Sequence, residues 1–130
     1  MAHPKAEVIR RLLDSLAKRD VEGAATNLAD DVVYHVSGHG PIAGVYKGRQ
    51  EVMGLARKQM ELTNGTFEIT EIHDVVANDD HVVAMIRIRA QRHDRAFDWA
   101  RVVVFHVEND RVTEAWIVEG DQAGLDRFLS

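Results

Sequence analysis

The first apolar positions of the chain recur with the spacing of an amphipathic helix. Over residues 5–18, apolar side chains form two adjacent rows at intervals of three and four residues, which predicts one face packed on a core. Pro4 suits the first helical turn, where its missing N–H costs no hydrogen bond. Asp20 has the position of an N-cap for a second, shorter helix over residues 21–28. The two rows of the first helix are Val8, Leu12, Leu16 and Ile9, Leu13, Ala17.

A strand, a glycine-rich segment and a third helix follow. Residues 32–36, VVYHV, predict a short strand because β-branched and aromatic side chains dominate them. Residues 37–48 match neither a phosphate-binding nor a dinucleotide-binding glycine pattern, so we interpret them as a long structured loop. Residues 49–62 have helical spacing, and Asn64-Gly65 ends that helix. Its inner side is expected to carry Val52, Leu55, Ala56, Gln59 and Met60.

Alternation with a period of two governs the second half of the chain and predicts four strands. They run over 66–76, with a bulge near Ile72-His73, over 81–92, and through a hairpin between 97 and 121. The connections are too short for parallel crossovers, which excludes a doubly wound parallel sheet. A short helix after Gly120-Asp121 ends the chain. The fold class is therefore α+β, in the order ααβαββββ with a short C-terminal helix.

The hairpin over residues 97–121 turns at Asn109-Asp110 and carries both tryptophans, Trp99 and Trp116. Because strand side chains alternate, residues 99, 101, 103 and 105 share one face. Both faces are largely apolar beyond Arg101, so we expect cover on both sides. A single helical layer covers one face only, and we expect the other to pack against a second copy of the chain, as a homodimer.

Composition and charge exclude several classes of protein. A length of 130 residues fits a single domain over 1–130. The absence of cysteine excludes disulfides, thiolate nucleophiles and sulfur-ligated metals. A formal charge of −5 without a long basic cluster argues against nucleic acid as a partner. No segment has the length of a signal-peptide core or a membrane span, so a cytoplasmic protein without membrane contact is expected.

The order of elements and three sequence segments resemble the SnoaL-like proteins of the nuclear-transport-factor-2-like superfamily. The segments are LADDVVYHV together with Asp20, GPIAGVYKGRQEV, and RVTEAWIVEGDQAGLDRF, and the resemblance covers nearly the whole chain. It implies a cone-shaped barrel, in which a strongly bent, mainly antiparallel sheet wraps around the N-terminal helices and encloses an apolar pocket. It also implies a homodimer formed through the outer face of the sheet.

Two enzyme families with this fold offer a residue-by-residue test. Steroid delta-isomerases, which the chain also resembles, carry a tyrosine and two aspartic acids at positions that fall on Leu12, Val36 and Val103. All three are apolar here, so we expect them to contact a ligand rather than to act as an isomerase of that design. The Asp-Arg-Asp set of limonene-type epoxide hydrolases is matched only in part, by Arg101 and Asp121.

Histidines and one aspartate are the candidate acid/base residues. An imidazole is suited to proton transfer at neutral pH, so His35 and His39 are candidate bases at the mouth of the pocket. A structural or interface role is the alternative for His35 if Val36 occupies the inward position. Asp121 resembles an acidic residue of SnoaL-like cyclases, with capping of the terminal helix as the alternative. A His35/His39 pair on a strand and a loop lacks the spacing of a zinc site, and we expect no metal.

Arg101 shares the phase of Trp99 on a mostly apolar strand. A buried guanidinium requires a partner, which we expect to be Asp121, Glu119, Glu114 or a ligand oxyanion. Aromatic residues supply flat surface that suits a ring-shaped ligand, although core or interface packing explains them equally well. These candidate ligand-contacting aromatic residues are Tyr34, Tyr46, Trp99, Phe105 and Trp116.

Two functions fit this sequence. The first is a cofactor-free acid/base enzyme of the cyclase, isomerase or dehydratase type, acting on a small apolar substrate that bears a carbonyl group. The second is a non-catalytic pocket for a hydrophobic ligand, or a dimeric assembly module. A large open pocket with an exposed base favours the first function, whereas Arg101 sealed by a carboxylate favours the second.

Overall fold

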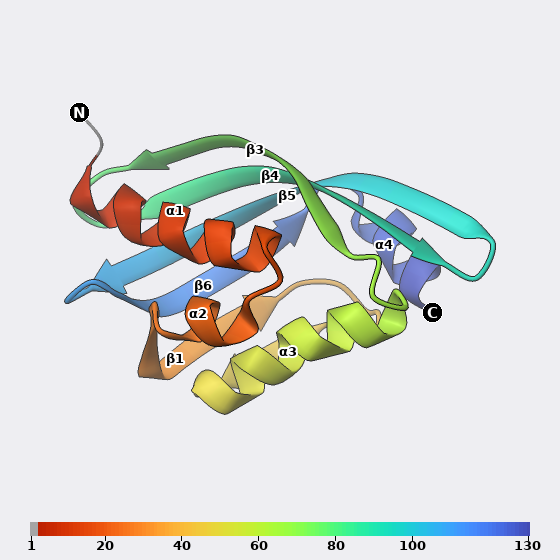
Figure 1. The fold of residues 1–130 in the computed structure, drawn as a ribbon, viewed down its shortest axis with the longest axis horizontal. Helices are drawn as coiled ribbons and strands as arrows, with labels where there is room; N and C mark the ends of the chain where they lie inside the picture. Colours follow the sequence, from red (N-terminus) through yellow and green to blue (C-terminus); the bar gives the residue numbers. More distant parts are fainter. Residues whose placement is uncertain (1–2) are drawn as a thin grey trace.

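The computed structural model describes residues 3–130 (Figure 1). None of the helices in this part of the chain has the length and hydrophobicity needed to cross a membrane. In chain order the elements are α1 (Pro4–Ala17), α2 (Val21–Ala25), β1 (Leu28–Val36), β2 (Gly44–Lys47), α3 (Arg49–Leu62), β3 (Glu68–Ala77), β4 (Val82–Arg92), β5 (Arg95–Glu108), β6 (Arg111–Glu119) and α4 (Gln122–Leu129).

The strands form one six-stranded sheet in the order β2-β1-β6-β5-β4-β3. Only β1 and β6 pair in parallel, and every other pair of neighbours is antiparallel. The sheet is strongly curved, and α1, α2 and α3 lie on its concave side (Figure 1). This arrangement confirms the predicted α+β cone, with β2 and β3 as the two free edges of a sheet that is not closed.

Local sequence signals set most of the boundaries as predicted. Asp20 caps α2 by accepting a hydrogen bond from the Gly23 N–H, and α3 spans the predicted residues. The register of β3 shifts between Ile72 and Asp74, where the bulge was expected. Asn109 and Asp110 both have positive φ angles, of 52° and 60°, which is the backbone of a type I′ hairpin turn.

The short strand β2 was not predicted. Its residues were included in the glycine-rich loop, but they pair with the end of β1 from Val36↔Gly44 to Val33↔Lys47. Gly44, the first residue of the strand, and Gly48, the residue directly after it, have positive φ angles of 138° and 88°. Glycine adopts such angles without steric cost, which suits the two ends of this short strand. Strand β1 is also longer than predicted, because α2 ends at Ala25 and extended backbone begins at Leu28.

Alternate residues of β5 and β6 form the floor of the cone. Val103 and Phe105 of β5, and Ala115 and Ile117 of β6, are buried on the inner face. Val103 and Phe105 share that face, as the alternation along the strand predicted. The C-terminal helix α4 packs on the same cluster, where the ring of Phe128 stacks on Phe97 at 5.3 Å between centroids. The N-terminal helices and α4 thus contribute to one continuous core.

Candidate functional site

An apolar cavity of about 160 Å³ lies between the helices and the concave face of the sheet. Helix α1 contributes Leu12, α3 contributes Leu55, and β5 contributes Val103 and Phe105. These residues are buried because each lies on the inward stripe of a helix or the inward phase of a strand. The apolar positions that face inward from the helices and strands therefore form both the core and the wall of the cavity.

Four residues with polar side chains line this cavity: Arg19, Tyr34, Gln59 and Arg101. Arg19 is exposed and donates a hydrogen bond from Nη1 to the Gly65 carbonyl oxygen at 2.7 Å. The other three are buried. Within residues 3–130, the lining includes no carboxylate and no imidazole.

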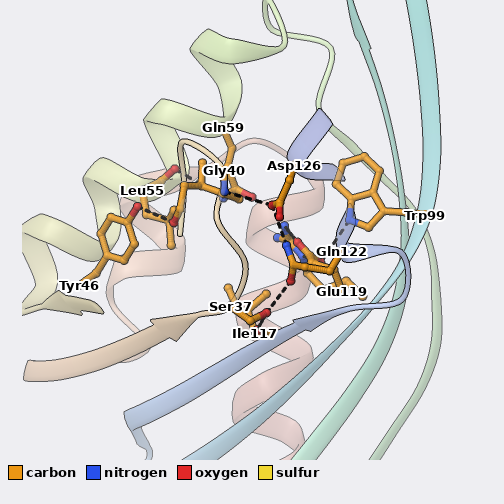
Figure 2. A network of polar contacts seen from close by, with 12 residues as sticks. Ser37, Gly40, Tyr46, Leu55, Gln59, Trp99, Ile117, Glu119, Gln122 and Asp126 are labelled. Atoms are coloured by element: carbon orange, nitrogen blue, oxygen red, sulfur yellow. Dashed lines mark hydrogen bonds and ion pairs between the residues drawn. The ribbon is translucent and has the colours of Figure 1, made fainter. Parts of the chain in front are cut away.

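Arg101 forms a bidentate ion pair with Glu119 on the neighbouring strand. Its Nε donates to Oε1 at 2.8 Å and its Nη2 donates to Oε2 at 2.7 Å. The Arg101 side chain is 6% exposed and the Glu119 side chain 0%. Trp99 donates from its indole N–H to Glu119 Oε1 at 3.2 Å, as Figure 2 shows. The prediction that a carboxylate partners Arg101 is confirmed for Glu119.

Two aromatic rings lie close to the Arg101 guanidinium. Its Cζ lies 5.7 Å from the centre of the Phe67 ring and 5.9 Å from that of the Trp99 ring. At these distances a guanidinium interacts favourably with the negative face of an aromatic ring. The ion pair and the rings together hold this cation in one orientation at the cavity wall.

Tyr34 projects from β1 into the same space. Burial raises the pKa of its hydroxyl well above the ordinary range, because the apolar surroundings disfavour the phenolate. The hydroxyl therefore stays protonated at any physiological pH. No hydrogen bond joins it to another group within residues 3–130.

Sequence reasoning did not single out Arg19 or Gln59 as a site residue, and of the two only Gln59 is buried. Its side-chain Oε1 is buried without a hydrogen-bond partner in the described part of the chain, and its Nε2 reaches only the Leu55 carbonyl oxygen at 3.5 Å. The signal for it was present, because a glutamine occurs on the otherwise apolar inner side of the third predicted helix.

The structure places His35 on the outer face of the sheet, away from the cavity. Its Nε2 lies 2.6 Å from Glu114 Oε2, and its ring stacks on Trp116 at 5.4 Å between centroids. The reason is strand phase, because Tyr34 and Val36 take the inward positions on either side of it. The position of His35 does not support a role as a base at the pocket. Trp116 lies on the outer face with it and does not line the cavity.

His39 and Asp121 are also remote from the cavity lining. Asp121 accepts a hydrogen bond from the Gly124 N–H at 2.9 Å and caps α4, which confirms the alternative role predicted for it. His39 is exposed in the loop after β1, and its backbone N–H donates to Asp126 Oδ2 at 3.1 Å. The three candidate acid/base residues are thus not brought together and none of them lines the cavity, whereas Arg101 does.

Asp126 of α4 forms hydrogen bonds that connect the glycine-rich loop to this helix (Figure 2). It accepts from the backbone N–H groups of His39 and Gly40 and from Gln122 Nε2, which also belongs to α4. Desolvation acts against the charged form, but these hydrogen bonds outweigh it and lower the pKa of the Asp126 carboxyl group. Sequence reasoning did not identify this contact, because its partners are remote in the chain.

The candidate ligand-contacting residues divide into two groups. Those that line the cavity are Leu12, Tyr34, Val103 and Phe105. Val36 and Trp99 are buried in the core without lining it, and Tyr46 is half-buried, with its hydroxyl donating to the Ile42 carbonyl oxygen at 2.7 Å. For metals, residues 3–130 contain no cluster of three or more histidine, aspartate or glutamate side chains placed as ligands.

Comparison with known proteins places this geometry in a family. Residues 9–115 match the model of the SnoaL-like domain. The uncharacterized protein Rv0034 of Mycobacterium tuberculosis is 28% identical over 123 residues, which cover 94% of this chain and 93% of that protein. Among solved structures, Bal32a from a soil-derived mobile gene cassette has a TM-score of 0.93 and 25% identity, covering 99% of this chain and 98% of its own.

An NTF2-like protein from Burkholderia xenovorans gives a TM-score of 0.83 at 19% identity, covering 100% of this chain and 98% of its own. At that identity the likeness concerns the fold alone. The family model, in contrast, matches most of the chain and includes Tyr34, Gln59 and Arg101 within its range. The chain has the fold of NTF2-like proteins and belongs to the SnoaL-like domain family.

Proposed function

We propose that this protein binds a small apolar molecule in the cavity of the cone. The observation that carries the proposal is a partly open space of about 160 Å³ whose wall is almost entirely aliphatic and aromatic. A protein cavity of about 150 Å³ with a comparable wall stays dry and takes up benzene. The molecule expected here is therefore about the size of one substituted ring.

The position of the titratable groups favours binding over acid/base chemistry. A general base has to lie within hydrogen-bonding reach of the proton that it removes. His35 and Asp121 have partners elsewhere, and both oxygens of Glu119 are engaged by Arg101. Of the two functions derived from the sequence, the ligand-binding pocket is the one that these contacts support.

Toluene provides a direct test, because it matches the volume of the cavity and has no polar group. In a protein with labelled methyl groups, toluene is expected to shift the NMR signals of Leu12 and Val103, which line the cavity, and to leave the outward-facing Val118 unchanged. Ala56→Trp fills the wall from α3 and is expected to abolish these shifts. Ala123→Trp, at an exposed position on α4, is the matched control. Unchanged Leu12 and Val103 signals at saturating toluene would refute the proposal.

We also propose that the outer face of the sheet forms a homodimer. Val118 on β6 is 52% exposed beside the half-buried Trp116, and Val45 and Val76 are 53% and 46% exposed on the edge strands β2 and β3. Exposed apolar surface of this extent on a sheet favours association. A second copy of the chain supplies a complementary apolar face, since a two-fold interface pairs the same patch on both subunits.

A further inference from the structure

We propose that the cavity selects neutral molecules with a hydrogen-bond acceptor oxygen, such as a ketone, through donors that Arg101 and Tyr34 supply, and that it discriminates against carboxylates. This inference rests on the proposed binding function and specifies its ligand class. Three features of the wall carry it: a free guanidinium nitrogen, a free hydroxyl group, and the neutralisation of the Arg101 charge by Glu119.

The first donor is Nη1 of Arg101. The hydrogen bonds to Glu119 use Nε and Nη2, and no bond from Nη1 to another group occurs within residues 3–130. Among the described residues, two buried side-chain atoms have no hydrogen-bond partner and are too deeply buried to contact a water molecule. These atoms are Arg49 Nε and Gln59 Oε1. Nη1 is not one of them. Since Arg101 is 5% exposed and lines the cavity, the space that Nη1 contacts is the cavity.

The second donor is the hydroxyl of Tyr34, and the same reasoning applies to it. The hydroxyl has no hydrogen-bond partner in the described part of the chain, and it is not one of the two fully buried atoms without a partner. The residue as a whole is 8% exposed. Because the hydroxyl remains protonated, it always carries a hydrogen to donate. The N–H groups of Arg101 Nη1 and the O–H of Tyr34 can therefore each donate a hydrogen bond to an acceptor atom of a ligand. A purely hydrocarbon ligand has no such atom and leaves these donors unpaired.

Charge decides between a neutral and an anionic acceptor. Glu119 pairs with Arg101 through both of its oxygens, so the buried pair carries no net charge. A carboxylate that enters the cavity loses its hydration and meets no uncompensated cation among the buried residues of the lining. Arg19, the other cation of the lining, is exposed, and solvent screens its charge. A neutral carbonyl oxygen accepts the same hydrogen bonds at a much smaller desolvation cost. We therefore expect ketones, enones and esters to bind in the cavity with higher affinity than carboxylates of the same shape.

Three probes of nearly equal shape test the proposal. Acetophenone carries a neutral carbonyl, α-methylstyrene replaces that oxygen by CH₂, and benzoate replaces the methyl ketone by a carboxylate. Affinities are measured by NMR titration on the wild type, on Tyr34→Phe and on the double variant Arg101→Met/Glu119→Gln. The double variant removes the ion pair without leaving one buried charge, and its glutamine keeps an acceptor for Trp99. Tyr46→Phe is the matched control, since its hydroxyl bonds Ile42 and does not line the cavity.

The expected result is specific to the ketone. The affinity for acetophenone falls about threefold to tenfold in Tyr34→Phe or in the double variant, the effect of losing one hydrogen bond. The affinity for α-methylstyrene stays level or rises, Tyr46→Phe changes neither, and benzoate binds the wild type more weakly than acetophenone.

Other outcomes separate this inference from the function on which it rests. If α-methylstyrene binds and both variants change the two neutral probes equally, the ligand class is wrong while the binding function stands. Benzoate that binds more tightly than acetophenone likewise overturns the preference for neutral molecules. If none of the three probes perturbs the residues of the lining, the binding function fails and the ligand class fails with it.

Discussion

Gln59 buries an amide oxygen that has no hydrogen-bond partner within residues 3–130. Such a group usually costs about 1–3 kcal/mol relative to its hydrated state. Folded proteins keep few of them, and those they keep tend to lie at functional sites. Because this oxygen is also buried away from the cavity space, a ligand in the cavity does not relieve the cost.

Replacing Gln59 by leucine is therefore expected to stabilise the fold. Gln59→Leu removes the unpaired oxygen, keeps a similar volume, and adds apolar surface where the neighbours are apolar. The free energy of unfolding should rise by about 1 kcal/mol in urea titrations. Gln50→Leu, at an exposed position on the same helix, is the control and should change stability by less than about 0.5 kcal/mol. A less stable Gln59→Leu would show that the amide makes a favourable contact in the fold.

The Arg101–Glu119 pair should behave as a unit. Arg101→Met leaves a buried carboxylate without its cation and is expected to cost about 3–5 kcal/mol of unfolding free energy. Adding Glu119→Gln removes that charge, so the double variant should recover most of the loss. Denaturant unfolding of both single variants and the double variant gives the coupling energy directly. Additive effects of the two changes would contradict a buried, mutually dependent pair.

At the scale of elements, the contact between the glycine-rich loop and α4 depends on one charge. The lowered pKa of Asp126 means that its carboxylate is more stable in the folded chain than in the unfolded one. The resulting stabilisation is present above the ordinary value of 3.8 and is lost as the pH falls through the lowered folded value. Acid should therefore loosen this contact.

Asp126→Asn tests that contact. The change removes the charge and one acceptor oxygen, and we expect a loss of less than about 1 kcal/mol near neutral pH, because the group is well solvated. Unfolding measured between pH 6 and about pH 3 should show a steeper loss of stability in the wild type than in the variant. Asp94→Asn, at an exposed turn, should keep the pH dependence of the wild type. If the unfolding free energies of the wild type and Asp126→Asn fall in parallel with pH, Asp126 is not the source of the acid sensitivity.

Elements defined by local chemistry were predictable, and elements defined by distant partners were not. A side-chain cap at Asp20, the helical spacing of Arg49–Leu62 and the Asn109-Asp110 turn act within a few residues, so the sequence displays them. Strand β2 has four residues and acquires its extended backbone by pairing with β1, which no local pattern encodes. The same limit explains why the bonds of Asp126 to the loop were not anticipated.

For the whole molecule, the alternation along the hairpin predicted that Arg101 and Val103 share one face, and the structure shows that this face is the inner one. The same rule applied to β1 shows why His35 points outward, since Tyr34 and Val36 occupy the alternate inward positions. What the phase cannot supply is the meeting of β1, α3 and β5 at one cavity. Tyr34, Gln59 and Arg101 come together only through the curvature of the sheet.

The outer face provides the prediction at the largest scale. Val118 is 52% exposed beside Trp116, so a dimer formed through this face would bury it in both subunits. Val118→Glu would place an unpaired charge on each side of the interface, and we expect it to raise the dimer dissociation constant about a hundredfold or more. Sedimentation velocity should show a wild-type dimer at micromolar concentration and a monomeric variant. Ala17→Glu, at an exposed position on α1, should leave the dimer intact. A monomeric wild type would instead mean that this apolar face serves a different partner.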